Sequence, residues 1–144
     1  MADCSFCEIV AGRAPGSILY RDDRVCAFLD IQPINRGHLL VVPVRHAADL
    51  ATLDSEDGAH LFLVAQRLAA ALRSAVRCEG ISLFVADGEV AGQEVAHVHL
   101  HVIPRFADDG FGFRFPPDPP DYGERPARAV LDEVAGSIRD LLDA

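Results

Sequence analysis

The chain has 144 residues, half of them hydrophobic, and a formal net charge of −9 at pH 7. This length and apolar content are enough for one domain with its own core. The acidic balance argues against a broad binding surface for nucleic acid or an anionic membrane, because both attract clusters of Lys and Arg. No apolar run reaches the roughly 20 residues of a membrane span, and residues 1–10 lack the basic and apolar regions of a signal peptide. We therefore expect a cytoplasmic globular protein in which an anionic ligand needs local donors.

The first half of the chain is predicted to be mostly sheet. Apolar residues at 18–20 and 25–30 flank the turn-prone segment RDDR, which predicts a β-hairpin with its turn near Asp22 and Asp23. A third strand is expected over 38–43, between a glycine and a proline that set its limits.

The second half begins with the clearest helix signal. From Ser55 to about Arg77 apolar residues recur at steps of three and four, after acidic residues suited to a helix N-terminus. Glu79 and Gly80 are expected to end this helix, and 81–86 then predicts a strand.

The last part of the chain has a different composition. After Arg105 proline, glycine and aspartate are frequent up to about Arg125, which predicts an irregular segment. Pro126 is suited to open a final helix. Its apolar stripe would consist of Val130, Val134, Ile138 and Leu141. We expect a main domain over 1–106, with the irregular segment and C-terminal helix of 107–144 packed on that same domain.

The run AHVHLHVIPR, residues 96–105, places three histidines at alternate positions. On a strand, side chains two residues apart share a face at ~7 Å, so His97, His99 and His101 are expected on one face and the apolar residues on the other. Each imidazole on a half-buried face needs partners for its nitrogens, so three in a row indicate a function. One fitting chemistry is a catalytic metal on three imidazoles with an open position for water. The other is nucleophilic catalysis, in which one imidazole attacks a phosphorus or acyl centre and a neighbour protonates the leaving group.

The segment GEVAGQEV, residues 88–95, helps to choose between these chemistries. Gly88, Gly92 and Gln93 precede the histidines directly, so exposed backbone N–H groups could form an anion-binding concavity beside the imidazoles. This arrangement favours a phosphate as the ligand.

At residues 97–103 the sequence resembles the histidine triad (HIT) nucleotide-binding proteins, whose signature is three histidines alternating with apolar residues. The resemblance covers 4–106. It includes AGQEV at 91–95, GHLLVVP at 37–43, AFLDIQP at 27–33 and the segment that starts at Cys4. It implies an α+β, HIT-like fold in which each protomer of a homodimer has a five-stranded antiparallel sheet and one long helix. The predicted C-terminal helix would be added to this fold.

The resemblance also implies roles for the histidines. His99 would attack the α-phosphate of a nucleotide and become transiently nucleotidylated, after which water releases a nucleoside monophosphate. One nitrogen of His99 must then be unprotonated, so the other should donate to an acceptor that fixes the tautomer. His101 would bind the phosphate or assist the leaving group. His38 resembles a histidine that supports the triad, with a purely structural role at a strand end as the alternative.

The nucleoside would be bound by residues earlier in the chain. Asp30 matches the acid that accepts hydrogen bonds from the ribose hydroxyls, a role that suits the two oxygens of a carboxylate. The apolar slot for a purine base matches Phe6, Ile9, Phe28 and Ile31. Each of these residues could equally be plain core.

Residues Gln93, Glu94 and Val95 complete the predicted nucleotide-binding set. Two positions depart from the family pattern: Ala86 replaces a frequent asparagine, and Glu94 replaces the serine or threonine that often follows the glutamine. Because a carboxylate facing a phosphate would repel it, we expect the Glu94 side chain to point away and its backbone N–H to bind.

Cys4 and Cys7 have the CxxC spacing that lets two thiolates hold one Zn²⁺. A zinc-bearing branch of the family adds two histidines at the positions of His46 and His97, so the resemblance implies a structural site of these four ligands. With four protein ligands no position remains for an activated water. The alternatives are two reduced thiols, or a redox pair, although a thioredoxin-like motif would lie between a strand and a helix.

The resemblance thus implies an enzyme: a nucleotidyl hydrolase or transferase acting on purine nucleoside phosphoramidates or dinucleoside polyphosphates. Two alternatives stay open. One is a non-catalytic, nucleotide-binding regulator with the same pocket, and the other is a metallohydrolase with its metal on all three strand histidines.

Overall fold

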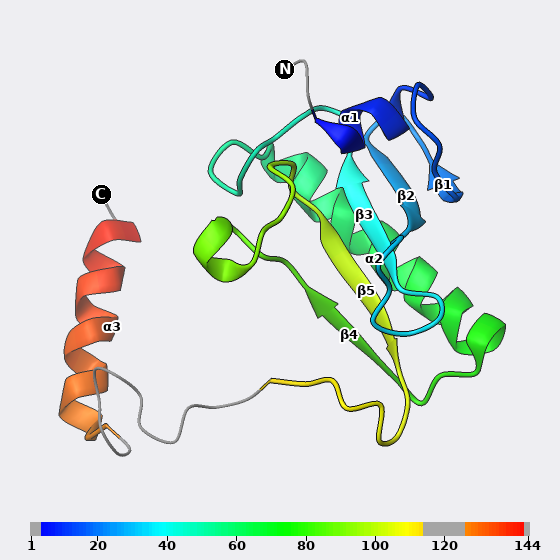
Figure 1. The fold of residues 1–144 in the computed structure, drawn as a ribbon. Coiled ribbons are helices and arrows are strands. Elements are labelled where there is room, and N and C mark those ends of the chain that lie inside the picture. Colours follow the sequence, from blue (N-terminus) through cyan, green and yellow to red (C-terminus); the bar gives the residue numbers. More distant parts are fainter. Residues whose placement is uncertain (1–3, 114–125, 143–144) are drawn as a thin grey trace. The chain divides into compact units, whose positions relative to one another are not determined.

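The computed structural model describes residues 4–113 and 126–142. Its contacts divide the chain into two units, Met1–Gly110 and Phe111–Ala144. The first unit contains a sheet with helices on both of its faces, and the described part of the second contains one helix, α3 (Arg128–Leu142) (Figure 1). The predicted boundary between 106 and 107 lies slightly earlier in the chain.

The sheet has five strands in the order β1-β2-β3-β5-β4, and every neighbouring pair is antiparallel. The strands are β1 (Ile18–Arg21), β2 (Val25–Leu29), β3 (Leu39–Pro43), β4 (Gly80–Phe84) and β5 (Leu100–Arg105). The predicted α+β class with a five-stranded antiparallel sheet is therefore confirmed. Asp22 and Asp23 lie between β1 and β2, as the sequence predicts for a hairpin turn.

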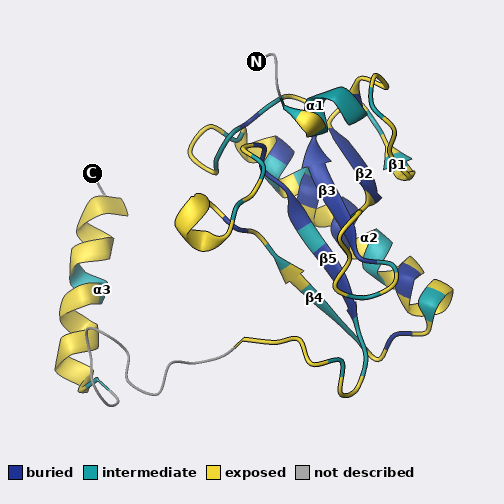
Figure 2. Ribbon diagram, in the orientation of Figure 1, coloured by how far each residue is buried: buried dark blue, intermediate teal, exposed yellow. Residues whose placement is uncertain are grey.

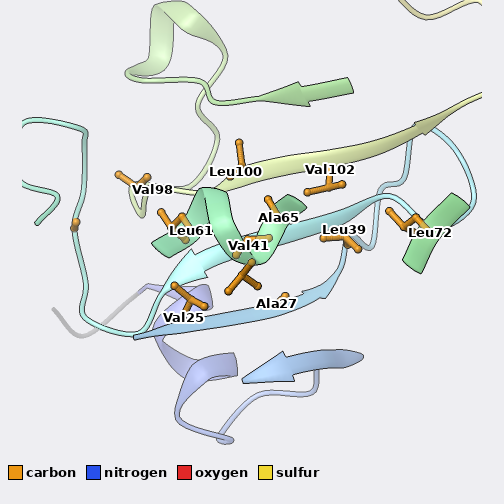
Figure 3. Close-up of a cluster of buried hydrophobic side chains, with 12 residues drawn as sticks. Val25, Ala27, Leu39, Val41, Leu61, Ala65, Leu72, Val98, Leu100 and Val102 are labelled. Carbon is orange, nitrogen blue, oxygen red and sulfur yellow. The ribbon is translucent and has the colours of Figure 1, made fainter. Parts of the chain in front are cut away.

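The long helix α2 (Ser55–Val76) covers one face of the sheet. It begins where the sequence predicts, because the Asp54 side chain accepts the N–H groups of Glu56 and Asp57 and so caps the helix. Figure 3 shows the core between α2 and the sheet. It contains Val25, Ala27, Leu39, Val41, Ala47, Leu61, Val64, Ala65, Leu72, Val98, Leu100 and Val102. Burying one such Val or Leu side chain stabilises the fold by about 1.5–3 kcal/mol.

The end of α2 differs from the prediction. Arg77, with φ 56°, closes the helix in the left-handed conformation, and Gly80 is the first residue of β4. Sequence reasoning assigned this stop to Glu79 and Gly80 because glycine is the usual residue at such a position. A non-glycine residue in this conformation costs about 1–2 kcal/mol and leaves no sequence signal.

The opposite face of the sheet carries α1 (Ser5–Val10), which the sequence analysis does not predict. A helix of six residues is too short for a periodic pattern to be visible. Val10 packs there with Cys26, Phe28, Leu40 and Val42. Strands β2 and β3 are therefore buried on both faces (Figure 2).

The histidine run is only partly strand. β5 begins at Leu100, whereas the sequence predicts a strand from 96. The N–H of His97 bonds to the carbonyl of Val95, and that of Val98 to the carbonyl of Ala47, so the backbone turns before it joins the ladder. The alternation still holds for the apolar side, because Val98, Leu100 and Val102 all lie in the core under α2.

In the second unit, α3 starts two residues after Pro126 and has an apolar stripe as predicted. Val130, Val134, Ile138 and Leu141 are all exposed. The packing of this helix on the main domain stays a prediction. Most of the predicted irregular segment, residues 114–125, lies outside the described residues. Among the helices that are described, none is both long and apolar enough to cross a bilayer.

Candidate active site

One row of side chains crosses the sheet on the face that carries α1. Phe28 pairs with Leu40, Leu40 with His101, and His101 with Phe84, each on a neighbouring strand. All four line a cavity of about 420 Å³. Helix α1 contributes Phe6 to the same cavity, and the Phe6 and Phe28 rings meet edge to face at 5.3 Å. The cavity therefore has an apolar side formed by α1 and the first strands.

His99 is the middle histidine and is only 5% exposed on the lining of this cavity. Its Nδ1 lies 2.7 Å from the backbone oxygen of His97. Since a carbonyl can only accept, Nδ1 carries the proton and donates it to this oxygen. A neutral His99 therefore keeps its lone pair on Nε2, as a nucleophile requires. The Phe6 ring packs against the imidazole edge to face at 5.2 Å.

His38 and His101 form a hydrogen-bonded pair beside it. The N–H of Ile34 donates to Nδ1 of His38 at 3.1 Å, so the proton of a neutral His38 is on Nε2. That nitrogen lies 2.9 Å from Nδ1 of His101 and donates to it. The proton of a neutral His101 is consequently on its Nε2, where it is available to a ligand. The ring of Phe84 stacks on His101 at 4.6 Å.

Electrostatics keep this pair uncharged near neutral pH. Burial, assisted by the neighbouring rings of His99 and His38, lowers the pKa of His101 to about 4. Burial also lowers the pKa of His38, against an opposing effect from Asp30, whose Oδ2 lies 3.5 Å from Nε2 of His38. Both rings are therefore neutral hydrogen-bond donors at pH 7.

The predicted nucleoside-binding residues of α1, β2 and the loop after β2 all line the cavity. They are Phe6, Ile9, Phe28, Asp30 and Ile31. Ile31 is 95% exposed and thus lies at the opening rather than in the core. One oxygen of Asp30 accepts the N–H of Gln32 at 2.8 Å, which holds the carboxylate in place.

The loop before the histidines presents its backbone to the cavity. Gly88 and Gly92, both with φ near 90°, adopt a conformation that other residues rarely take. Gly92, Glu94 and Val95 line the cavity. Within the described chain no acceptor takes the N–H of Glu94 or Val95. These two donors fit the predicted anion-binding concavity.

Gln93 stands apart from this group. Its side chain accepts the N–H of Gly88 at 2.8 Å and donates to the carbonyl of Ala48 at 2.8 Å. It is not among the residues that line the cavity. The side chain thus fixes the path of the loop, and a direct contact of Gln93 with a ligand stays a prediction.

Cys4, Cys7, His46 and His97 come together next to the cavity, and their ligand atoms all lie within 4.8 Å of one another. Nδ1 of His97 is 3.3 Å from Sγ of Cys4 and 3.3 Å from Nδ1 of His46. Zinc bond lengths in a tetrahedral site give separations of roughly 3.4 Å between two nitrogens and 3.6 Å between nitrogen and sulfur. His97 Nε2 donates to the carbonyl of Pro43 at 2.9 Å, which leaves Nδ1 free to ligate. The donor set and its geometry therefore fit a tetrahedral Zn²⁺.

The three strand histidines do not converge on one point. In the part of the chain that is described, the groups able to hold a metal contain His97 or His101 but never His99. The second group is Asp30, His38 and His101, but there Nε2 of His38 carries a proton. A cation at this position would have to displace that proton, so the hydrogen-bonded arrangement accounts for these residues better.

Sequence reasoning missed several contributors to the cavity, among them Phe84 and Ile34. Phe84 was assigned only to a strand, because the register that places it opposite His101 depends on the whole sheet. The backbone N–H of Ile34, which fixes the tautomer of His38, gives no side-chain signal at all.

Imidazoles, backbone N–H groups and an apolar slot thus meet at one cavity on the antiparallel sheet of a small α+β protein, an arrangement that fits a phosphate-bearing ligand. A HIT domain model matches residues 11–108, which is more than half of the chain. The protein therefore belongs to the HIT family.

Individual relatives extend this likeness beyond the matched domain. An uncharacterized HIT-like protein of Borreliella burgdorferi is 43% identical over 116 residues, which cover 79% of this chain and 84% of the relative. The crystal structure of SMU.412c from Streptococcus mutans is 37% identical with a TM-score of 0.89, over 99% of this chain and 87% of that one.

Two further solved structures are similar to this chain over most of its length. A zinc-bound histidine triad family protein of Mycobacterium smegmatis is 40% identical with a TM-score of 0.73, over 93% of this chain and 96% of that one. A histidine triad nucleotide-binding protein of Candida albicans is 28% identical with a TM-score of 0.85, over 98% of both chains. Family membership thus supports nucleotide binding or hydrolysis as the kind of function.

Proposed function

We propose that the protein hydrolyses, or transfers the nucleotidyl group of, a purine nucleoside 5′-phosphate derivative through a covalent intermediate on His99. The observation that carries this proposal is the hydrogen bond from Nδ1 of His99 to the His97 carbonyl, because it leaves Nε2 unprotonated at the cavity. The proposed purine slot is formed by Phe6, Ile9, Phe28 and Ile31, and Asp30 would accept the ribose hydroxyls.

The chemistry follows from the proton positions. Nε2 of His99 attacks the α-phosphorus while the bond between this phosphorus and the leaving group breaks. Nε2–H of His101 donates a hydrogen bond to the reacting phosphate, the N–H groups of Glu94 and Val95 hold its other oxygens, and the departing amine takes its proton from solvent. Water then attacks the phosphorus opposite Nε2 of His99, the bond to His99 breaks, and the proton lost by the water returns to solvent. The products are the nucleoside monophosphate and free His99.

Charge in the cavity favours one substrate class over the other. The described lining residues include two carboxylates, those of Asp30 and Glu94, and neither Arg nor Lys. A dinucleoside polyphosphate would bring several negative charges without a cationic partner, whereas a phosphoramidate brings one. A phosphoramidate is therefore the better substrate in this proposal.

We also assign Zn²⁺ to the site formed by Cys4, Cys7, His46 and His97. Bound there, the metal would supply a structural cross-link between α1 and the segment before β5, since four protein ligands complete its coordination. Cys4 is the residue that precedes α1, and Cys7 lies within it. The proposed zinc would thus hold the helix that carries Phe6.

The proposed setting is the cytoplasm, because none of the four cysteines is paired in a disulfide, as expected in a reducing compartment. The proposed assembly is a homodimer, as the resemblance implies. The exposed Leu83 on the edge strand β4 and the exposed Phe62 on α2 offer apolar area for it.

Incubation with adenosine 5′-phosphoramidate tests the reaction. We expect release of AMP and, on rapid quenching, an acid-labile nucleotidyl adduct on His99. The variant His99→Ala should lose at least about a thousandfold in kcat/KM, because the nucleophile is gone. His60→Ala is the matched control, since His60 bonds to Asp22 and does not line the cavity.

The same experiment decides between this proposal and its alternatives. Tight AMP binding without adduct or release would support the regulator. Turnover that persists in His99→Ala would overturn the role of His99, and turnover that chelation abolishes without loss of AMP binding would support the metallohydrolase.

A further inference from the structure

The direction in which a leaving group departs follows from the burial of the nucleophile. His99 is only 5% exposed, so it lies at the inner end of the cavity. In displacement at phosphorus the attacking and leaving atoms lie roughly in line with the phosphorus between them. A leaving group displaced by His99 therefore points toward the opening of the cavity.

The charge at that opening belongs to Glu94. Several lining residues are exposed, and among them Glu94 alone carries a charge, since Asp30 is partly buried. Within the described residues the Glu94 carboxylate has no hydrogen-bond or ion-pair partner. The carboxylate is thus available to a group outside the protein.

Neighbouring groups do not cancel this charge. The imidazoles of His38 and His101 lie on the same cavity, and burial lowers the pKa of both. No Arg or Lys is found among the described lining residues. The opening is therefore acidic at neutral pH, unlike a site adapted to a polyphosphate tail.

We infer that Glu94 is a specificity-determining residue that selects substrates with a cationic amine on the leaving group. This inference rests on the proposed function. The preferred substrate class is then a nucleoside 5′-phosphoramidate of a diamine. The backbone N–H of Glu94 meets the phosphate, and its carboxylate, at the exposed end of the same residue, meets the ammonium group of the departing amine.

Three adenosine phosphoramidates of similar length test the inference. Their amines are putrescine, which leaves a cationic tail, butylamine, which leaves a neutral tail, and γ-aminobutyrate, which leaves an anionic tail. The wild-type protein should show the highest kcat/KM for the putrescine derivative. We take the ratio of kcat/KM for the putrescine derivative to kcat/KM for the butylamine derivative. Glu94→Gln should lower this ratio by about fivefold, which is the effect of one exposed charge pair at contact in water. The ratio should also fall with added salt in the wild type but not in the variant.

Glu89→Gln is the matched control, because Glu89 lies in the same loop, in the short helix η1 (Glu89–Ala91), but does not line the cavity. It should leave the ratio unchanged. If Glu94→Gln also leaves it unchanged while AMP is still released, the inference is overturned and the proposed function stands.

A binding measurement covers the case of no turnover. Alkyl phosphodiesters of AMP with an aminobutyl or a butyl chain carry the same tails but a poor leaving group. The wild type should bind the aminobutyl ester about fivefold more tightly, and Glu94→Gln should bind the two equally. Equal binding by the wild type would overturn the inference. Absent turnover with preserved discrimination would overturn only the proposed function.

Discussion

The proton of each imidazole at the cavity is placed by one neighbour. A backbone oxygen fixes the tautomer of His99, and a backbone N–H fixes that of His38, which in turn fixes His101. Among the described residues, no carboxylate is the direct partner of His99. The arrangement therefore provides an acceptor nitrogen and a donor nitrogen without needing a charged residue between them.

The buried pair makes stability depend on pH. The pKa of His101 is lowered from 6.5 to about 4, so between these values the unfolded chain binds more protons than the folded one. Stability from this group is complete above the unfolded pKa and is lost as pH falls toward the folded pKa. We expect the free energy of unfolding to decrease by roughly 2 to 3 kcal/mol between pH 7 and pH 4 from His101 alone.

Urea unfolding across this pH range measures the effect. His101→Gln should reduce the loss of unfolding free energy between pH 7 and pH 4, whereas His60→Gln should show the same loss as the wild type. A profile for His101→Gln as steep as that of the wild type would contradict this assignment of the acid sensitivity.

At the scale of elements, α1 links the proposed metal site to the cavity. Phe6 lies in the helix between the two cysteines and contacts both Phe28 and His99. A helix of six residues has little stability of its own, so its position depends on what holds it. We expect zinc to hold it.

Cys7→Ser should therefore weaken AMP binding about fivefold or more and lower the zinc content, while the far-ultraviolet circular dichroism of the sheet is retained. Metal analysis and calorimetric titration with AMP check both results. Cys78→Ser is the control, because Cys78 is a buried thiol outside the metal group. Loss of zinc with unchanged AMP affinity would show that α1 does not need the metal.

The predictable elements are those with a long pattern. Helix α2 and strands β2 and β3 have runs whose periodicity or continuous apolar character reflects their burial. Helix α1 and the turn before β5 have no such run. They are set by tertiary contacts such as the bond from Val98 to Ala47, which no local pattern contains.

The residues of the site also divide into those that the sequence predicts and those that it does not. The motif residues His38, His99 and His101 come from sequence, as does the metal group. Phe84 required the register of the sheet, and the role of Gln93 in holding its loop required the bonds to Gly88 and Ala48. The sequence therefore predicts that the motif side chains and the metal group come together, but not the sheet register and backbone bonds that place Phe84 and Gln93.

At the scale of the whole molecule, the edge strands of the sheet bear most on assembly with a second copy. β1 and β4 are the edge strands, and an edge presents unpaired N–H and C=O groups that natural proteins cover or pair. Leu83 on β4 and Phe62 on α2 are exposed. A symmetric contact of these surfaces with a second copy would cover them.

We predict that Phe62→Arg shifts the protein toward the monomer in sedimentation velocity at micromolar concentration, because two copies of the new charge would face one buried interface. Leu19→Arg is the control, since Leu19 is exposed on the opposite edge strand. A wild-type protein that sediments as a monomer would exclude the dimer, and equal effects of the two variants would place the interface elsewhere.

The oxygen that orients His99 belongs to the main chain of His97. No substitution at position 97 removes a peptide carbonyl, so replacing the imidazole there would discard the proposed metal ligand and still leave the acceptor that orients His99.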